Sequence, residues 1–120
     1  MSRHIIAIVD DLFSAAKIGG TAEQAGVKAT FPRTAEAALE AALNESPSLI
    51  LCDLHVKKID ALELARRLKA DERTRDIPLV GFFAHVQTEL QRGAKEAGFD
   101  RVIPRSVFAA SLIGILTGKE

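Results

Sequence analysis

Three aspartates in this 120-residue sequence follow short apolar segments and are placed where they could share a cation. Asp10 and Asp11 come directly after a β-branched run that ends at Val9, and Asp53 follows the sequence Leu-Ile-Leu-Cys. If the two apolar segments are neighbouring parallel strands, about 4.8 Å apart, the three carboxylates converge on one small volume. Like charges held together need a proton or a cation, and Mg²⁺ suits carboxylate and carbonyl oxygens. The alternative is that these aspartates only cap helices and form turns.

The rest of the sequence supplies elements that could position these residues. Short apolar runs predict five strands, at His4–Val9, Val27–Phe31, Leu49–Cys52, Leu79–Phe83 and Arg101–Ile103. Stretches rich in Ala, Glu and Leu predict five helices, at Leu12–Ala25, Ala35–Asn44, Ala61–Asp71, Gln87–Ala97 and Val107–Thr117. This alternation predicts an α/β fold whose parallel strands are joined by right-handed crossovers.

Local signals mark several helix boundaries. Gly26 and Gly98 each stand between a helical stretch and a strand, where a positive φ commonly ends a helix. Thr34, Asp60 and Ser106 stand just before predicted helices and are therefore expected to be N-caps.

The composition of the strands predicts their order. The first and third strands are continuous apolar runs, which is typical of strands covered by helices on both faces. In Val27–Phe31 polar and apolar residues alternate, as in an edge strand. We therefore predict a doubly wound five-stranded parallel sheet in the order 2-1-3-4-5. In such sheets the site lies at the carboxyl ends of the central strands, which is where the three aspartates fall.

Four segments of the sequence, in their order and spacing, resemble those of a two-component response-regulator receiver domain. The resemblance extends along nearly the whole chain. The four segments are Ile-Ala-Ile-Val-Asp-Asp at residues 6–11, Leu-Ile-Leu-Cys-Asp-Leu at 49–54, Ile-Asp-Ala-Leu-Glu-Leu at 59–64 and Glu-Ala-Gly-Phe-Asp at 96–100. The resemblance implies a flavodoxin-like (βα)5 fold forming a single domain over residues 1–120.

The resemblance also implies a role for each acidic residue. Asp53 would be the phosphoacceptor, taking a phosphoryl group from a phosphohistidine. Asp10, Asp11, Asp53 and the backbone carbonyl of His55 would bind Mg²⁺, which neutralises charge on the transferred group. Receivers act by positioning and electrostatics, and we expect this chain not to be an enzyme.

Several positions depart from the usual receiver residues. Arg105 stands where receivers have a phosphate-pairing Lys, and with Ala84 it is expected to contact phosphate. Phe83 replaces the usual Thr or Ser, Val102 replaces the switching aromatic, and Ser106 replaces a Pro that follows a cis bond. A cis bond before Ser106 would cost about 3 kcal/mol, so a trans bond or a strained loop is expected. These changes leave Mg²⁺ binding plausible while removing the usual conformational readout.

The predicted last helix, Val107–Thr117, is apolar around most of its circumference. Packing against one sheet requires an apolar stripe only about 100° wide. The excess predicts contact with a second subunit, a transmitter or an output domain. We therefore expect a homodimer through this helix as one candidate assembly.

Three functions remain open at this point. The leading one is a bacterial phosphorelay receiver whose partner is a histidine kinase, a phosphotransfer protein or a downstream effector. The alternative is a phosphorylation-independent pseudo-receiver that serves as a protein-interaction module. A small Mg²⁺-dependent phosphohydrolase is disfavoured, because His55 occupies the place of the second acid that such an enzyme needs.

Composition excludes other classes of function. Sixteen Lys plus Arg balance sixteen Asp plus Glu, which argues against coating nucleic acid or an anionic membrane. No run approaches the roughly 18 apolar residues of a membrane span. The single cysteine, Cys52, cannot form an internal disulfide, so we expect a cytoplasmic location. The length matches one receiver-like unit, which we expect to act through a partner.

Overall fold

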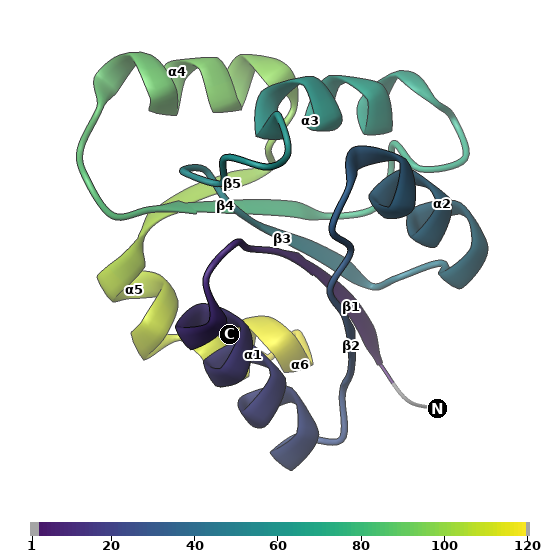
Figure 1. Ribbon diagram of the computed structural model, residues 1–120, viewed down its shortest axis with the longest axis vertical. Coiled ribbons are helices and arrows are strands. Elements are labelled where there is room, and N and C mark those ends of the chain that lie inside the picture. Colours follow the sequence, from purple (N-terminus) through teal and green to yellow (C-terminus); the bar gives the residue numbers. More distant parts are fainter. Residues whose placement is uncertain (1–2, 120) are drawn as a thin grey trace.

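The computed structural model describes residues 3–119, which form a parallel sheet between two layers of helices (Figure 1). The strands are β1 (His4–Ile8), β2 (Lys28–Thr30), β3 (Leu49–Asp53), β4 (Leu79–Phe83) and β5 (Arg101–Pro104). The helices are α1 (Leu12–Gln24), α2 (Ala35–Glu45), α3 (Ala61–Ala70), α4 (Thr88–Ala97), α5 (Arg105–Ala110) and α6 (Leu112–Thr117). The sheet order is β2-β1-β3-β4-β5, which confirms the predicted doubly wound order.

Each face of the sheet is covered by its own group of helices. Helices α2, α3 and α4 pack on one face, and α1, α5 and α6 pack on the other (Figure 1). Every residue of β3 and β4 is buried, as expected for strands covered on both sides. The edge strand β2 is less buried, with Lys28 exposed, in agreement with its alternating sequence.

The predicted caps at Thr34 and Asp60 are confirmed. The Thr34 hydroxyl accepts a bond from the Ala37 N–H at 3.0 Å, and the Asp60 carboxylate accepts one from the Glu63 N–H at 3.1 Å. Gly26 has a φ of 73° and Gly98 a φ of 117°, so both adopt the left-handed conformation expected of them.

The end of the chain differs from the prediction in two ways. Ser106 is not an N-cap, because α5 begins at Arg105, two residues before the predicted start at Val107, with Pro104 in the capping position at a φ of −63°. Pro104 has a ψ of 150°, so it is the last extended residue of β5 and the helix follows it directly. The single predicted helix is also divided, since Ser111 leaves helical geometry with a ψ of 9°. Figure 1 shows the resulting change of direction between α5 and α6. No cis peptide bond occurs within residues 3–119, so the bond before Ser106 is trans.

The two short C-terminal helices bury only part of their apolar surface. The buried side chains are Phe108, Leu112, Ile115 and Leu116. Val107 is 42% exposed and Ile113 is 59% exposed, so some of the predicted excess remains on the surface. None of the helices in the described region is both long and apolar enough to span a membrane.

A lysine joins three elements on the far side of the sheet from α1. The Lys69 ammonium donates to the backbone carbonyls of Arg75 and Ile77, at 3.0 and 3.1 Å, and to the Asp100 carboxylate at 3.0 Å. The same carboxylate accepts the N–H of Leu79 at the start of β4, at 2.8 Å. The end of α3 is therefore tied to both β4 and β5.

Candidate functional site

The most deeply placed acid of the site is Asp53, the last residue of β3, which is only 6% exposed. One carboxylate oxygen, Oδ1, accepts a bond from the His55 N–H at 2.8 Å. The other, Oδ2, accepts a bond from Nη2 of Arg105 at 3.3 Å. Asp53 is thus oriented by its own loop on one side and by a cation from the start of α5 on the other.

The two acids after β1 are exposed and are held by other partners. Asp10 Oδ2 accepts the Lys57 N–H at 2.6 Å, and the Lys58 ammonium lies 4.0 Å from Asp10 Oδ1. Asp11 is the N-cap of α1, where its carboxylate accepts the Ser14 N–H at 2.8 Å. This backbone hydrogen bond holds the pKa of Asp11 below its usual range, because it stabilises the charged form.

The structure brings the three aspartates to one edge of the sheet without gathering them into a ligand cluster. Within residues 3–119, no three His, Cys, Asp or Glu side chains lie close enough together to hold a metal ion. Asp10, Asp11 and Asp53 each bind protein donors instead. Asp11 therefore caps α1 in this structure, and its other carboxylate oxygen has no part in the cap. The donor set fits Mg²⁺ in kind, since it consists of hard carboxylate and carbonyl oxygens.

The two switch positions lie on the other face of the sheet from the side chain of Asp53. Successive residues of a strand point to opposite faces, and Asp53 pairs in register with Phe82. Phe83 is buried in the apolar cluster beneath α3 and α4, and Val102 packs against the same cluster. Phe83 therefore does not fill the space beside Asp53. A large side chain at 83 and a small one at 102 share the core where receivers place a hydroxyl and an aromatic.

Ala84 and two histidines lie on loops near the site. Ala84 is exposed directly after β4, on the loop where the resemblance places a phosphate contact. The rings of His55 and His85 meet edge to face, with centroids 5.9 Å apart. The Nε2 atom of His55 is buried and has no hydrogen-bond partner within the described part of the chain.

The single cysteine lies behind the site. Cys52 is 1% exposed, and burial raises the pKa of its thiol far above the usual value. Because the thiolate is the reactive form, this side chain is inert in the folded protein.

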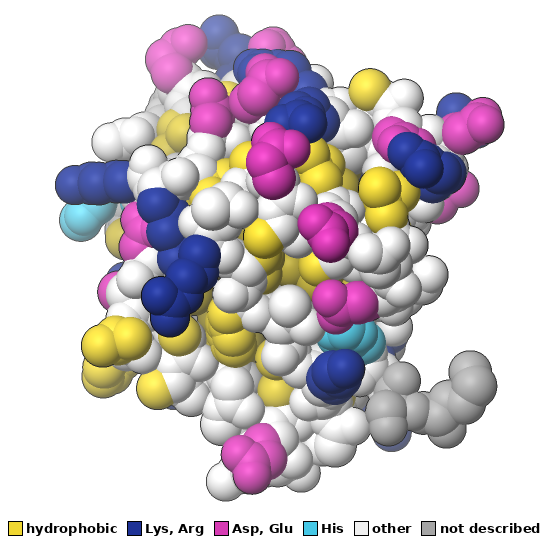
Figure 2. Space-filling view, turned by 45° about the vertical axis from the view of Figure 1, so that its right-hand side comes forward, with side chains coloured by type: hydrophobic (Ala, Val, Ile, Leu, Met, Phe, Trp, Pro, Cys, Tyr) yellow, Lys and Arg dark blue, Asp and Glu magenta, His cyan; other side chains and the backbone are white. Residues whose placement is uncertain are grey.

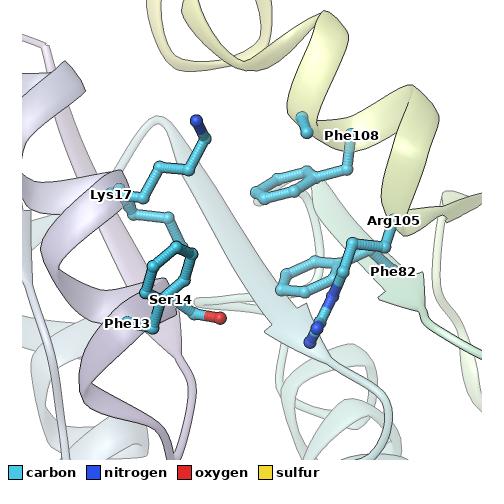
Figure 3. Close-up of a pocket in the computed structure, with 8 residues that line it drawn as sticks. Phe13, Ser14, Lys17, Phe82, Arg105 and Phe108 are labelled. Carbon is cyan, nitrogen blue, oxygen red and sulfur yellow. The ribbon is translucent and has the colours of Figure 1, made fainter.

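A pocket between α1 and α5 was not apparent from the sequence. It has a volume of about 210 Å³ and is lined by Phe13, Ser14, Lys17, Ile18, Phe82, Arg105, Phe108 and Ala109 (Figure 3). Arg105 belongs both to this pocket and to the contact with Asp53, so the two are adjacent. The lining residues come from α1, β4 and α5, and only the folded topology brings them together.

Comparison of the sequence with known proteins places the chain in a family. The response regulator receiver domain matches residues 6–117. The phosphate regulon transcriptional regulatory protein PhoB of Pseudomonas aeruginosa is 31% identical over 112 residues, covering 92% of this chain and 49% of that protein. The polar-differentiation response regulator DivK of Brucella ovis is 23% identical over 107 residues, covering 89% of this chain and 87% of DivK. This chain belongs to the response regulator receiver domain family, and it spans about half the length of PhoB.

Solved structures show the same fold. The chemotaxis response regulator CheY4 of Vibrio cholerae has a TM-score of 0.84 and 14% identity, with 100% of both chains covered. The receiver domain of a sensor histidine kinase from Pseudomonas aeruginosa, solved with magnesium coordinated in its active-site cleft, also has a TM-score of 0.84. It is 19% identical, and the match covers 98% of this chain and 97% of that one. Receiver domains are typically non-enzymatic signalling domains of two-component systems.

Proposed function

We propose that this chain is an atypical receiver of a two-component phosphorelay, with Asp53 as its phosphoacceptor. The observation that carries the proposal is a buried carboxylate at the end of β3 with the Arg105 guanidinium 3.3 Å away. A carboxylate oxygen of Asp53 attacks the phosphorus of a phosphohistidine, the P–N bond breaks, and the imidazole leaves. Arg105 and the backbone at Ala84 then face the new phosphoryl oxygens. An arginine binds such oxygens through two donors.

We also propose that Mg²⁺ binds this site, where it would compete with Lys58 and Arg105 for the carboxylates of Asp10 and Asp53. The donors would be Asp10, Asp11, Asp53 and the backbone carbonyl of His55, which match Mg²⁺ in kind. The ion supplies charge neutralisation for the transferred phosphoryl group. The related histidine-kinase receiver with magnesium in its cleft supports this assignment. In this chain Asp10 and Asp53 must first give up their contacts with Lys58 and Arg105.

A phosphorylation-independent pseudo-receiver is the second candidate, and one feature of the structure favours it. Phe83 and Val102 fill the region where receivers couple a hydroxyl to a movable aromatic side chain. A modification shifts a conformational equilibrium only through contacts that differ between two states. Without that hydroxyl, a phosphoryl group on Asp53 has no familiar contact through which to repack β4 and β5.

The partners follow from the class of protein. We propose that a histidine kinase or phosphotransfer protein donates the phosphoryl group and that an effector protein reads the result, in the cytoplasm. Val107 and Ile113, both exposed, support a homodimer through the C-terminal helices. Sedimentation of the protein alone and with beryllofluoride would show whether a dimer forms and whether the site controls it.

Phosphoryl acceptance is tested by exposing the full chain to Mg²⁺ and acetyl phosphate, followed by intact-mass and peptide mass spectrometry. We expect one phosphoryl adduct, located at Asp53 and missing from Asp53→Asn. The control is Asp60→Asn, which changes an exposed helix cap without removing its capping oxygen. Absence of an adduct, together with unchanged spectra in beryllofluoride, would leave the pseudo-receiver as the function. Sustained release of phosphate would indicate the hydrolase.

A further inference from the structure

The pocket between α1 and α5 has a chemistry that the proposed function does not use. Phe82 and Phe108 stack with ring centroids 4.1 Å apart and planes 9° from parallel. Phe13, which is 82% exposed, lies across the pocket from them on α1 (Figure 3). An apolar cavity of roughly 150 Å³ is large enough for benzene. The pocket, at about 210 Å³, therefore accommodates one aromatic ring with a short substituent.

The charged groups around this apolar space are cationic, and Ser14 adds one neutral hydroxyl. Lys17 and Arg105 line the pocket, and no acidic residue does. Figure 3 shows their charged ends at opposite ends of the pocket, with the phenylalanine rings between them. The Lys17 ammonium forms no ion pair or hydrogen bond within residues 3–119. Arg105 uses one N–H of its Nη2 on Asp53. The second N–H of Nη2 remains, and with a neighbouring N–H it forms a parallel pair of donors for another acceptor.

We propose that this pocket binds a small aromatic carboxylate. The ring lies between Phe13 and the Phe82–Phe108 pair, where offset or edge contacts between aromatic rings are favourable. The carboxylate binds Arg105, whose planar fork matches it geometrically, and Lys17 adds a second positive charge. The ligand class thus follows from an apolar space of one-ring size whose charged lining residues are both cations.

Arg105 links this pocket to Asp53. Its guanidinium carbon lies 5.9 Å from the centre of the Phe82 ring, and its Nη2 lies 3.3 Å from the Asp53 carboxylate. A carboxylate in the pocket and a negative charge at position 53 therefore share one cation and repel each other. Coupling of this kind is reciprocal. The negative charge at position 53 weakens ligand binding, and the bound ligand weakens the interaction of Arg105 with position 53 by the same factor. Regulation of phosphorylation by such a ligand rests on the proposed function, whereas binding of the ligand does not.

Binding is tested with phenylacetate, titrated into the ¹⁵N-labelled full chain and followed by amide chemical shifts. We expect saturable shifts confined to residues 13–18 and 105–109 and to the β4 residues around Phe82, with a Kd of about 1 mM or lower. Phenylacetamide, which lacks the charge, and acetate, which lacks the ring, should each bind at least about 10-fold more weakly. Ala109→Leu fills the pocket from α5 and should abolish binding. Ala110→Leu, on the same helix outside the pocket, should not.

The remaining outcomes decide the proposal. Shifts that do not saturate, shifts elsewhere, equal binding of either analogue, or full binding by Ala109→Leu would each overturn the pocket assignment. Asp53→Asn tests the link, since it removes the negative charge beside Arg105 without any phosphorylation, and it should tighten phenylacetate binding several-fold. Unchanged affinity in Asp53→Asn would overturn the coupling through Arg105. Because neither measurement uses a phosphoryl donor, failure of Asp53 to accept a phosphoryl group would be recognised separately.

Discussion

At the scale of single residues, the acids of the candidate site already have cationic or N–H partners within the protein. Asp53 faces Arg105, and Asp10 faces Lys58 and the N–H of Lys57. The two switch positions are apolar and belong to the core rather than to the site. Their side chains therefore affect stability, whereas the cations around the acids affect the binding of ions.

Replacing Phe83 with Thr should destabilise the fold even though it restores a typical receiver residue. Phe83 is 4% exposed, and removing a buried phenyl group costs about 3 kcal/mol in cavity and transfer terms. Urea unfolding followed by circular dichroism measures the loss. Phe13→Thr is the matched control, since Phe13 is 82% exposed and should change stability by about 0.5 kcal/mol or less. Equal effects at the two positions would contradict the burial of Phe83.

Removing the Lys58 side chain should strengthen Mg²⁺ binding. The Lys58 ammonium is 4.0 Å from Asp10, and an exposed pair of this kind contributes about 0.2–1 kcal/mol. Lys58→Ala should therefore lower the Kd for Mg²⁺ by roughly 1.4-fold to 5-fold, measured by calorimetry at low salt. Lys57→Ala is the control, because Lys57 contacts Asp10 through its backbone. Weaker binding in Lys58→Ala would show that the lysine does not compete with the metal.

At the scale of elements, the starts of α1 and α5 place residues of the candidate site at the carboxyl ends of the strands. Asp11 is the N-cap of α1, and Arg105 is the first residue of α5, so a residue of the candidate site stands at the start of each helix. On the opposite side, Lys69 connects the end of α3 to β4 and β5. Gly98 allows this contact, because a Cβ at that position would lie 2.5 Å from Cγ of Lys69.

The Lys69 junction should account for a measurable part of the stability. Lys69→Met keeps an apolar stem but removes the donor to two carbonyls and to Asp100, and we expect a loss of about 1–2 kcal/mol in urea unfolding. Lys95→Met, on the exposed surface of α4, is the control and should be close to neutral. An equal effect of the two substitutions would mean that the junction adds nothing beyond an ordinary surface lysine.

At the scale of the whole molecule, the formal net charge is zero, and many of the charged side chains form local pairs. On the face seen in Figure 2, basic and acidic side chains are interspersed rather than gathered by sign. Asp71 accepts hydrogen bonds from the side chain and backbone of Arg73, which lower its pKa to about 2. The Ser14 N–H lowers the pKa of Asp11 in the same direction.

These shifts predict how acid affects the fold. An acid whose pKa is lower in the folded state than in the unfolded state stabilises the fold above its unfolded value of about 4. That contribution is lost as the pH falls through the folded value, so for Asp71 the window is pH 4 to about 2. Asp71→Asn should flatten the dependence of unfolding free energy on pH in this window, and Arg73→Gln should do the same. Curves parallel to that of the unsubstituted protein would contradict the assignment.

The architecture could be predicted because strands and helix ends are marked by residues that lie close together in the sequence. Apolar runs, Gly26 and Gly98 predict the strands and the helix ends, and the structure confirms them. The break at Ser111 was missed because an apolar sequence looks helical on either side of it. The ion pairs of Lys58 and Lys69 were missed for another reason. Their acceptors lie 48 and 31 residues away in the sequence, and only the fold brings them near.

The burial of Cys52 makes this thiol a natural reporter of motion. It precedes Asp53 in the central strand and has no access to solvent in the native state. A thiol reagent can therefore modify it only during openings that expose β3, and in fast exchange the labelling rate measures the population of the open state. Any ligand that binds the closed form should slow labelling in proportion to its occupancy. The chain has neither tryptophan nor tyrosine to serve as a fluorescent probe. The labelling rate of Cys52 can therefore report on ligand binding at the neighbouring Asp53.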